Sequence, residues 1–140
     1  MAGPELRVYT DGASRGNPGH GGFGVVILDA EGATREERQG YLGLCTNNVA
    51  EYRALLDALA ALPRHAPARV VFHLDSELVV KQINGQYKVK DLKMQELHAL
   101  VKKALLAVPA WTVKYVPREE NRRADALANA AIDEALRSTA

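Results

Sequence analysis

The sequence predicts an α/β fold in which one mixed, five-stranded sheet carries helices on both faces. Two observations support this prediction. The first third of the chain contains three runs of β-forming residues separated by glycine-containing segments, which is typical of antiparallel hairpins. The rest alternates helical and extended patterns, which is typical of strands joined by covering helices. A chain of 140 residues with 47% hydrophobic residues fits one domain, spanning 1–140.

The amino-terminal half is expected to form three strands and one helix. The strands share β-forming residues on alternating or consecutive positions, and they are predicted at 6–10, 23–28 and 34–44. The glycine-rich run 11–22 is expected to be a loop, because glycine favours turns. Thr46 or Asn47 can cap the helix, whose apolar residues recur at helical spacing until Pro63 ends it.

The carboxyl-terminal half is expected to add two strands and three helices. The strands are predicted at 69–74 and 111–116, and the first is apolar enough to be a buried parallel strand. The helices are predicted at 76–83, at 93–106 and from a cap at Asn121 onward. The resulting order of elements is β-β-β-α-β-α-α-β-α.

The composition argues against a membrane-spanning or disulfide-based protein. No stretch has the apolar length of a membrane span, and residues 1–5 lack the features of a signal peptide. Cys45 is the single cysteine, so it cannot form an intramolecular disulfide. The formal net charge of +1 gives no global signal for a nucleic-acid partner. We expect a cytoplasmic monomer that does not associate with membranes.

Four acidic residues lie where predicted strands end or predicted helices begin, and they are Asp11, Glu51, Asp75 and Asp125. If the strands before Asp11 and Asp75 are parallel neighbours, their carboxyl ends meet at one edge of the sheet, where ligand sites of open α/β sheets occur. Clustered carboxylates repel each other unless a multivalent cation joins them, and Mg²⁺ and Mn²⁺ prefer oxygen ligands. Four carboxylates can hold two such ions about 4 Å apart, and such a pair stabilises both the attacking and the leaving oxygen of an in-line phosphoryl displacement. Taken singly, each acid also fits a turn residue, a helix cap or a solvated helix residue.

Four motifs carry a resemblance to a known family. They are the run 9–19 (YTDGASRGNPG), the run 46–52 (TNNVAEY), the pair Asp75-Ser76 and the run 121–128 (NRRADALA). With these motifs in this order, the chain resembles type 1 ribonuclease H over residues 6–135. The resemblance implies a ribonuclease H-like fold and a metal-dependent endoribonuclease. Such an enzyme hydrolyses the RNA strand of RNA/DNA hybrids by a two-metal mechanism, leaving 5′-phosphate and 3′-hydroxyl ends.

The resemblance also implies roles for individual residues. Asp11, Glu51, Asp75 and Asp125 match the family's ligands of two Mg²⁺ ions, for which Mn²⁺ can substitute, and Asp11 would bridge both ions. The implied substrate contacts come from Gly12, Ala13, Ser14, Arg15, Gly16, Asn17, Thr46, Asn47, Asn48 and Glu77. Asparagine amides both donate and accept, which suits the ribose 2′-hydroxyl that distinguishes RNA from DNA. The glycine-rich run would let the backbone approach a minor groove closely. Asn17 also fits a plain turn, and Asn47 a plain helix cap.

The loop before the last helix departs from the family pattern. Many members carry a histidine there, whereas residues 117–121 contain none, and Arg118 is the nearest candidate for its role. An arginine stays protonated near neutral pH, so it cannot act as a general base. Arg118 could hold a phosphate or help expel product, and a solvated loop arginine is the alternative.

Two further departures concern substrate binding. The segment 81–92 is too short for the basic extension found in many members, so Lys88, Lys90 and Lys93 are expected to substitute for it in part. We expect weaker binding of the hybrid and a steep dependence of affinity on salt. Glu77 stands where some members carry a glutamine that contacts RNA.

Two other functions stay open from the sequence. One is a non-catalytic module that binds RNA or hybrids on the same fold, although the presence of all four acids argues against it. The other is a phosphodiesterase or resolvase acting on DNA junctions or ends, although the asparagine pair and the glycine-rich run favour ribose recognition. Cleavage of double-stranded RNA is open as a side activity.

Overall fold

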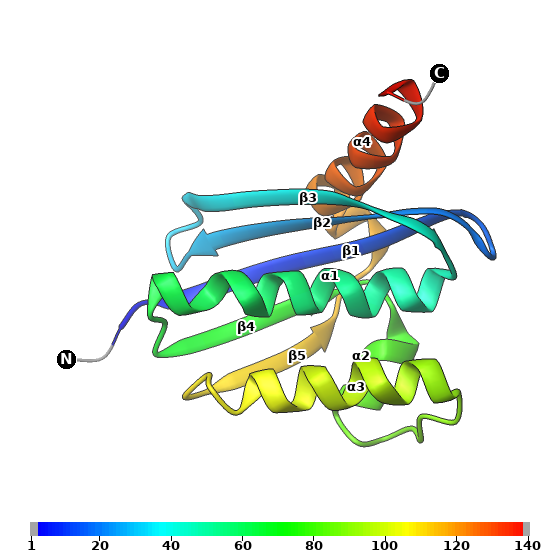
Figure 1. The fold of residues 1–140 in the computed structure, drawn as a ribbon. Helices are drawn as coiled ribbons and strands as arrows, with labels where there is room; N and C mark the ends of the chain where they lie inside the picture. Colours follow the sequence, from blue (N-terminus) through cyan, green and yellow to red (C-terminus); the bar gives the residue numbers. More distant parts are fainter. Residues whose placement is uncertain (1–2, 139–140) are drawn as a thin grey trace.

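The computed structural model describes residues 3–138, and its centre is a five-stranded sheet in the order β3-β2-β1-β4-β5 (Figure 1). The strands are β1 (Glu5–Gly16), β2 (Gly19–Asp29), β3 (Thr34–Cys45), β4 (Arg69–Leu74) and β5 (Trp111–Tyr115). The helices are α1 (Asn47–Ala61), α2 (Glu77–Ile83), α3 (Leu92–Leu105) and α4 (Arg122–Ser138), with short 3₁₀ turns η1 (Leu62–His65) and η2 (Arg118–Glu120). The β1–β3 strands pair antiparallel and β4 and β5 join in parallel, so the predicted mixed sheet is confirmed.

The glycine-rich run 11–22 forms strand, and the prediction of a loop was wrong. β1 and β2 pair antiparallel up to Gly16 opposite Gly19, which leaves two residues for the turn. Gly12 is needed for close packing, whereas Gly16, with a φ of +115°, serves the turn. A side chain on Gly12 would lie 2.1 Å from the carbonyl carbon of Ala50 in α1. Glycines in a strand often mark such a close approach of another backbone, and the sequence does not distinguish this from a turn.

The parallel strands align their carboxyl ends at one edge of the sheet. Thr10 of β1 lies opposite Leu74 of β4. Asp11 and Asp75 directly follow this pair, so their backbones are level at that edge. The register therefore meets the condition under which the two distant aspartates were expected to approach each other.

The main core lies between the sheet and the layer of α1 and α3 (Figure 1). Val8, Val25 and Phe72 of the sheet are fully buried there against Tyr52 and Leu55 of α1. Burying a large apolar side chain contributes about 1.5–3 kcal/mol before conformational entropy is counted. This packing makes α1 a rigid base for the residues at its amino-terminal end.

The opposite face of the sheet is covered by α4, which approaches β2 closely (Figure 1). A side chain on Gly24 would come within 2.1 Å of the Ala124 carbonyl oxygen, and one on Gly22 within 2.6 Å of the Ala128 carbonyl oxygen. These glycines therefore allow the helix backbone to lie directly on the strand. The close approach holds the first turns of α4, which carry Asp125, against the sheet.

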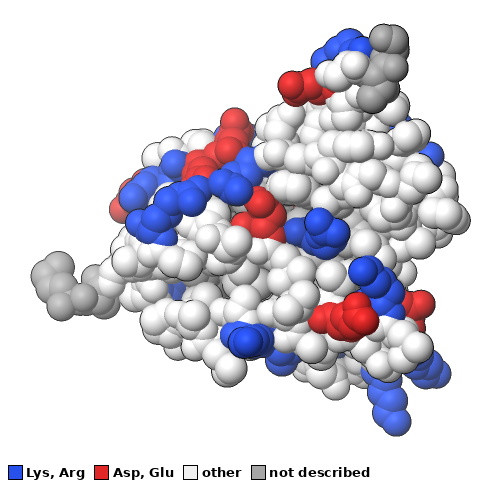
Figure 2. Space-filling view, in the orientation of Figure 1, with Lys and Arg blue, Asp and Glu red and all other residues white. Residues whose placement is uncertain are grey.

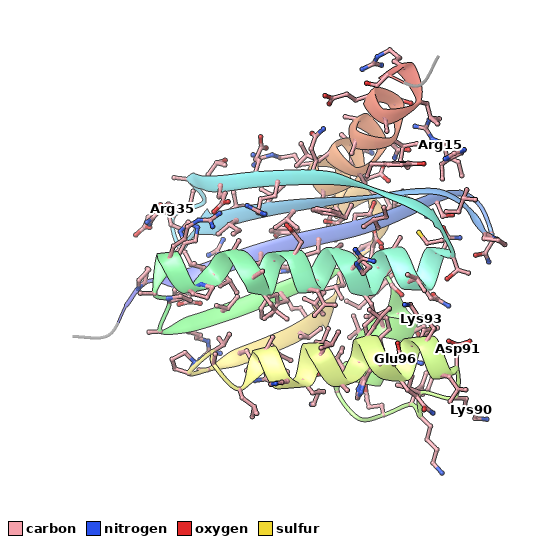
Figure 3. All side chains as sticks on the ribbon, in the orientation of Figure 1. Arg15, Arg35, Lys90, Asp91, Lys93 and Glu96 are labelled. Atoms are coloured by element: carbon pink, nitrogen blue, oxygen red, sulfur yellow. The ribbon has the colours of Figure 1, made fainter. Side chains whose placement is uncertain are left out.

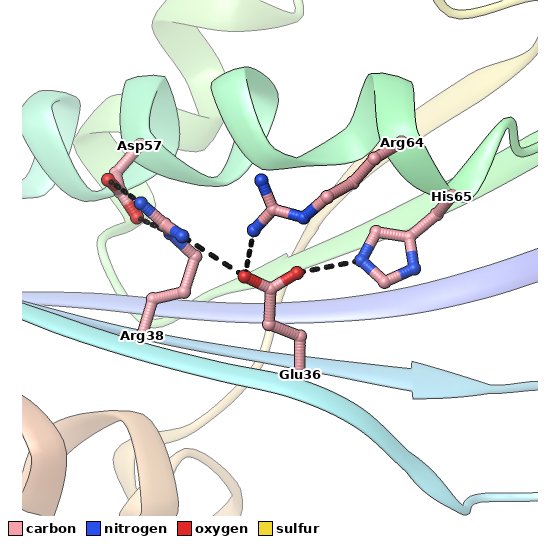
Figure 4. A network of polar contacts seen from close by, with 5 residues as sticks. All are labelled: Glu36, Arg38, Asp57, Arg64 and His65. Atoms are coloured by element: carbon pink, nitrogen blue, oxygen red, sulfur yellow. Dashed lines mark hydrogen bonds and ion pairs between the residues drawn. The ribbon is translucent and has the colours of Figure 1, made fainter.

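A charged network ties β3 to α1 and η1 (Figure 4). The Glu36 carboxylate accepts hydrogen bonds from Arg38 and Arg64, and its other oxygen lies 2.8 Å from His65 Nε2. Arg38 Nε also donates to Asp57 of α1 at 2.7 Å. Burial alone would raise the pKa of Glu36, but the hydrogen bonds from His65, Arg38 and Arg64 outweigh it and lower the pKa to about 2. The network holds the outer hairpin against the helical layer.

Charged side chains of both signs intermingle on the face shown in Figure 2, which fits the formal net charge of +1. Within residues 3–138, each helix is too short or too polar to span a bilayer.

Candidate active site

Three carboxylates from three different elements converge at the carboxyl edge of the parallel strands. One oxygen each of Asp11, Glu51 and Asp75 lies within 4.8 Å of the other two. Asp11 belongs to β1, Asp75 follows β4, and Glu51 lies in the second turn of α1. Both Asp11 and Glu51 are buried, at 6% and 8% exposure. Buried acids this close together are uncommon unless they are paired or coordinate a cation.

The backbone of β1 holds Glu51 in this cluster. Its Oε1 accepts a hydrogen bond from the Gly12 N–H. The same glycine has no side chain to separate β1 from α1, so the strand and the helix approach closely enough for the bond to form. The small size of Gly12 therefore positions a carboxylate, and the predicted contact of Gly12 with a nucleic acid stays a prediction.

The electrostatics of the cluster disfavour its charged form when no cation is bound. Burial raises the pKa of Asp11 far above its ordinary value, and the charges of Glu51 and Asp75 raise it further. Burial also raises the pKa of Glu51, and Asp75 adds to this, while the Gly12 N–H and the positive charge of Arg118 oppose it. A divalent cation would relieve this repulsion, because it supplies positive charge to hard oxygen donors.

A cleft of about 440 Å³ surrounds the carboxylates. Its lining consists of Asp11, Gly12, Ala13, Ser14, Asn47, Asn48, Glu51, Asp75, Ser76, Arg118 and Asp125. The structure therefore brings together all four predicted acids, Arg118 and five of the predicted substrate contacts. Asp125 lies outside the closest cluster of three, but its side chain interacts with Asp11 and contributes to the raised pKa of that residue. Ser76 is an additional lining residue, and its hydroxyl caps α2 by accepting from the Val79 N–H.

Asn17, Thr46 and Gly16 were predicted to contact substrate but lie outside the lining of the cleft. Asn17 Oδ1 accepts from the Asn47 N–H at 3.2 Å, so it supports a residue that does line the cleft. Thr46 caps α1, because its hydroxyl accepts from the Val49 N–H at 3.3 Å. Gly16 lies at the end of the β1–β2 hairpin.

Arg15 and Glu77 also lie outside the cleft lining, and each has a partner within the protein. Arg15 forms an ion pair with Asp133 of α4 at 2.6 Å, and Figure 3 shows it beside that helix. Glu77 forms an ion pair with Lys81 one turn later at 2.7 Å. Neither partner was predicted, and the Arg15 pair joins residues 118 positions apart, which no local pattern reveals.

Two asparagines that were not predicted as site residues donate hydrogen bonds to acids of the site. Asn129 Nδ2 lies 3.3 Å from Asp125 Oδ1, one helical turn away, and the i, i+4 spacing could have revealed this contact. Asn121 was predicted only as a helix cap. Its Nδ2 donates to Asp75 Oδ2 at 3.1 Å, and this partner lies 46 residues earlier in the chain.

Known proteins are similar to this chain in sequence and in architecture. A family model described as "Reverse transcriptase-like" matches residues 9–131. Ribonuclease HI of Halobacterium salinarum is 38% identical over 133 residues, covering 95% of this chain and 67% of that protein. The bifunctional protein Rv2228c of Mycobacterium tuberculosis is 38% identical over 135 residues, and this chain spans only 37% of its length. The solved structure of LC11-RNase H1, isolated from compost, in complex with an RNA/DNA hybrid matches with a TM-score of 0.90 at 45% identity, covering 94% of this chain and 99% of that one.

Proposed function

The chain belongs to the type 1 ribonuclease H family, and we propose that it hydrolyses the RNA strand of RNA/DNA hybrids at the cleft that holds the acidic cluster. The observation that carries this proposal is the convergence of Asp11, Glu51 and Asp75 from distant parts of the chain into one buried cluster. The hybrid bound to the related LC11-RNase H1 supports the class of substrate.

We further propose that Asp11, Glu51, Asp75 and Asp125 hold two Mg²⁺ ions, or Mn²⁺ in their place. The hard carboxylate oxygens suit either ion. When bound, the two ions would activate a water and stabilise the departing 3′ oxygen of an in-line displacement. Because the water oxygen joins phosphorus as the bond to the 3′ oxygen breaks, the products carry a 5′-phosphate and a 3′-hydroxyl. Within the chain, the Gly12 N–H keeps Glu51 facing the site throughout.

Recognition of RNA is assigned to the amides at the start of α1. Asn47 and Asn48 line the cleft, and each amide offers both donors and an acceptor to a ribose 2′-hydroxyl. Gly12, Ala13 and Ser14 form the adjacent wall of the cleft. Asn17 acts through Asn47, whereas Arg15 and Glu77 form ion pairs with Asp133 and Lys81 on the surface, outside the cleft, and are the weaker candidates for substrate contacts.

Cleavage of three labelled duplexes tests the proposal. The RNA/DNA hybrid should be cut in Mg²⁺ or Mn²⁺ and left intact in EDTA, duplex DNA should be left intact, and double-stranded RNA shows whether a side activity exists. Asp11→Asn should reduce cleavage of the hybrid to background while the protein stays folded by circular dichroism. Binding of the hybrid without any cleavage would instead indicate a binding module. Cleavage of DNA alone would indicate another phosphodiesterase of the same fold.

Arg118 is proposed to hold a phosphate oxygen or to help product leave. It lines the cleft, and its positive charge opposes the rise in the pKa of Glu51 that burial causes. Arg118→Ala should lower turnover of the hybrid about tenfold, equivalent to ~1.4 kcal/mol, without abolishing it. Arg122→Ala is the matched control, because Arg122 is exposed nearby but does not line the cleft. Equal turnover for wild type and Arg118→Ala at saturating substrate would remove Arg118 from the mechanism.

A further inference from the structure

We propose that Asn121 is a positioning residue that sets the relative places of three of the four acids, and this inference rests on the proposed metal-dependent function. Asn121 lies between η2 and α4 and is 1% exposed. Its contacts reach β1, the residue after β4, and α4. These are the elements that carry Asp11, Asp75 and Asp125.

Three hydrogen bonds make these links. Asn121 Nδ2 donates to the Thr10 carbonyl oxygen at 2.8 Å, directly before Asp11 in the chain. The same nitrogen donates to Asp75 Oδ2 at 3.1 Å. The main-chain oxygen of Asn121 accepts from the Asp125 N–H at 3.1 Å. Asn121 therefore contacts the carboxylate of Asp75 and the backbone N–H of Asp125. It also contacts the backbone of Thr10, the residue before Asp11.

The chemistry of the two side-chain partners requires an amide NH₂ at this position. Both the Thr10 carbonyl and the Asp75 carboxylate only accept hydrogen bonds, and the NH₂ group offers one proton to each. Asn121 Oδ1 is buried without a partner among the described residues. Leaving a buried acceptor unpaired costs about 1–3 kcal/mol, so this side chain is a poor device for stability alone. The hydrogen bond from Asn121 Nδ2 instead fixes the orientation of the Asp75 carboxylate.

Orientation matters because a carboxylate that can rotate binds a cation less tightly. Groups that hydrogen-bond to metal ligands typically change metal affinity or activity about 10–100-fold when they are removed. The competing explanation is that Asn121 only starts α4. Serine and asparagine are about equally favoured at the start of a helix, so Asn121→Ser would keep the helix-starting role. Its single, shorter hydroxyl would not supply two donors to Thr10 and Asp75.

Calorimetric titration of the full chain with Mg²⁺ and with Mn²⁺ alone tests this proposal. Asn121→Ala and Asn121→Ser should both bind the ions at least about tenfold more weakly than wild type. Asn84→Ala is the matched control, because Asn84 Nδ2 also donates to a backbone oxygen, that of Val113 at 2.9 Å, away from the acids. Thermal unfolding of each variant is measured in parallel. The control should lose stability without losing metal affinity.

The outcomes separate the two proposals. If wild type binds neither ion and cuts no hybrid, the proposed function fails. If wild type does both and Asn121→Ser binds the ions like wild type, only the positioning role fails and Asn121 is a helix-starting residue. If Asn121→Ala does not fold, Asn121→Ser alone decides. Weak binding by Asn121→Ser with a wild-type melting temperature would establish the role through Asp75.

Discussion

At the scale of single residues, the dominant feature is the burial of like charges. Asp11 and Glu51 are two of the six polar or charged residues that are buried within residues 3–138, and they lie in one cluster with Asp75. Hydrogen bonds from the Gly12 N–H to Glu51 and from Asn121 to Asp75 favour charged carboxylates within the cluster, but they do not offset the burial and repulsion that raise the pKa of Asp11. The metal-free site is therefore electrostatically unfavourable at high pH, and this has a measurable consequence for stability.

Asp11→Asn is expected to stabilise the metal-free protein at about pH 8. Asp11 and Glu51 have native pKa values above their unfolded values, so the native state binds more protons than the unfolded state in this range. Wild-type stability should then fall as pH rises from about 4 through the raised pKa values. The melting temperature of the variant should exceed that of wild type by about 3 °C or more at about pH 8, and the two should converge at or below about pH 4.

Thermal unfolding in EDTA, followed by circular dichroism, measures this difference. Adding Mg²⁺ is the internal control, because an ion that binds the native state stabilises wild type more than the variant. A wild-type protein more stable than Asp11→Asn in EDTA at about pH 8 would contradict the account of charge repulsion.

At the scale of elements, tertiary contacts determined the structure of segments whose local sequence pattern was ambiguous. Strands and helices with clear apolar periodicity were predicted to within one or two residues, as α3 and β5 show. The run 11–22 was wrongly predicted to be a loop. Gly12 allows β1 to lie close to α1, and Gly22 allows β2 to lie close to α4. The Glu36 network likewise joins residues of β3, α1 and η1, and no sequence spacing predicts it.

Glu36→Gln should lower the free energy of unfolding by about 1–2 kcal/mol near neutral pH, because hydrogen bonds to a charged group are replaced by neutral ones. The native pKa of about 2 lies below the ordinary value of 4.5, so the stabilisation is present above about pH 4.5 and lost as pH falls toward 2. Urea unfolding across this range measures the effect. Glu31→Gln, at an exposed position between β2 and β3, is the control. A difference that does not change with pH would indicate packing rather than charge.

At the scale of the whole molecule, the acidic cluster lies at the carboxyl edge of the parallel strands, in a sheet that helices cover on both faces (Figure 1). The resemblance to type 1 ribonuclease H and the α/β sheet predicted from the sequence are confirmed by the family match and the structural likeness. The expected contribution of Lys88, Lys90 and Lys93 to binding stays a prediction, and Figure 3 shows Lys90 and Lys93 at the start of α3. A cytoplasmic location and a monomeric state also stay predictions.

The sequence by itself determined the class of fold and the family, and ten of the fifteen residues that it predicted for the site line the cleft, because motifs of acids, glycines and asparagines record local chemistry. Only the tertiary structure decided that Arg15 faces Asp133, that Gly12 holds Glu51, and that Asn121 reaches Asp75. The physical reason is distance along the chain. A hydrogen bond or ion pair depends on where two groups lie in space, and residues dozens of positions apart leave no periodic trace of their contact.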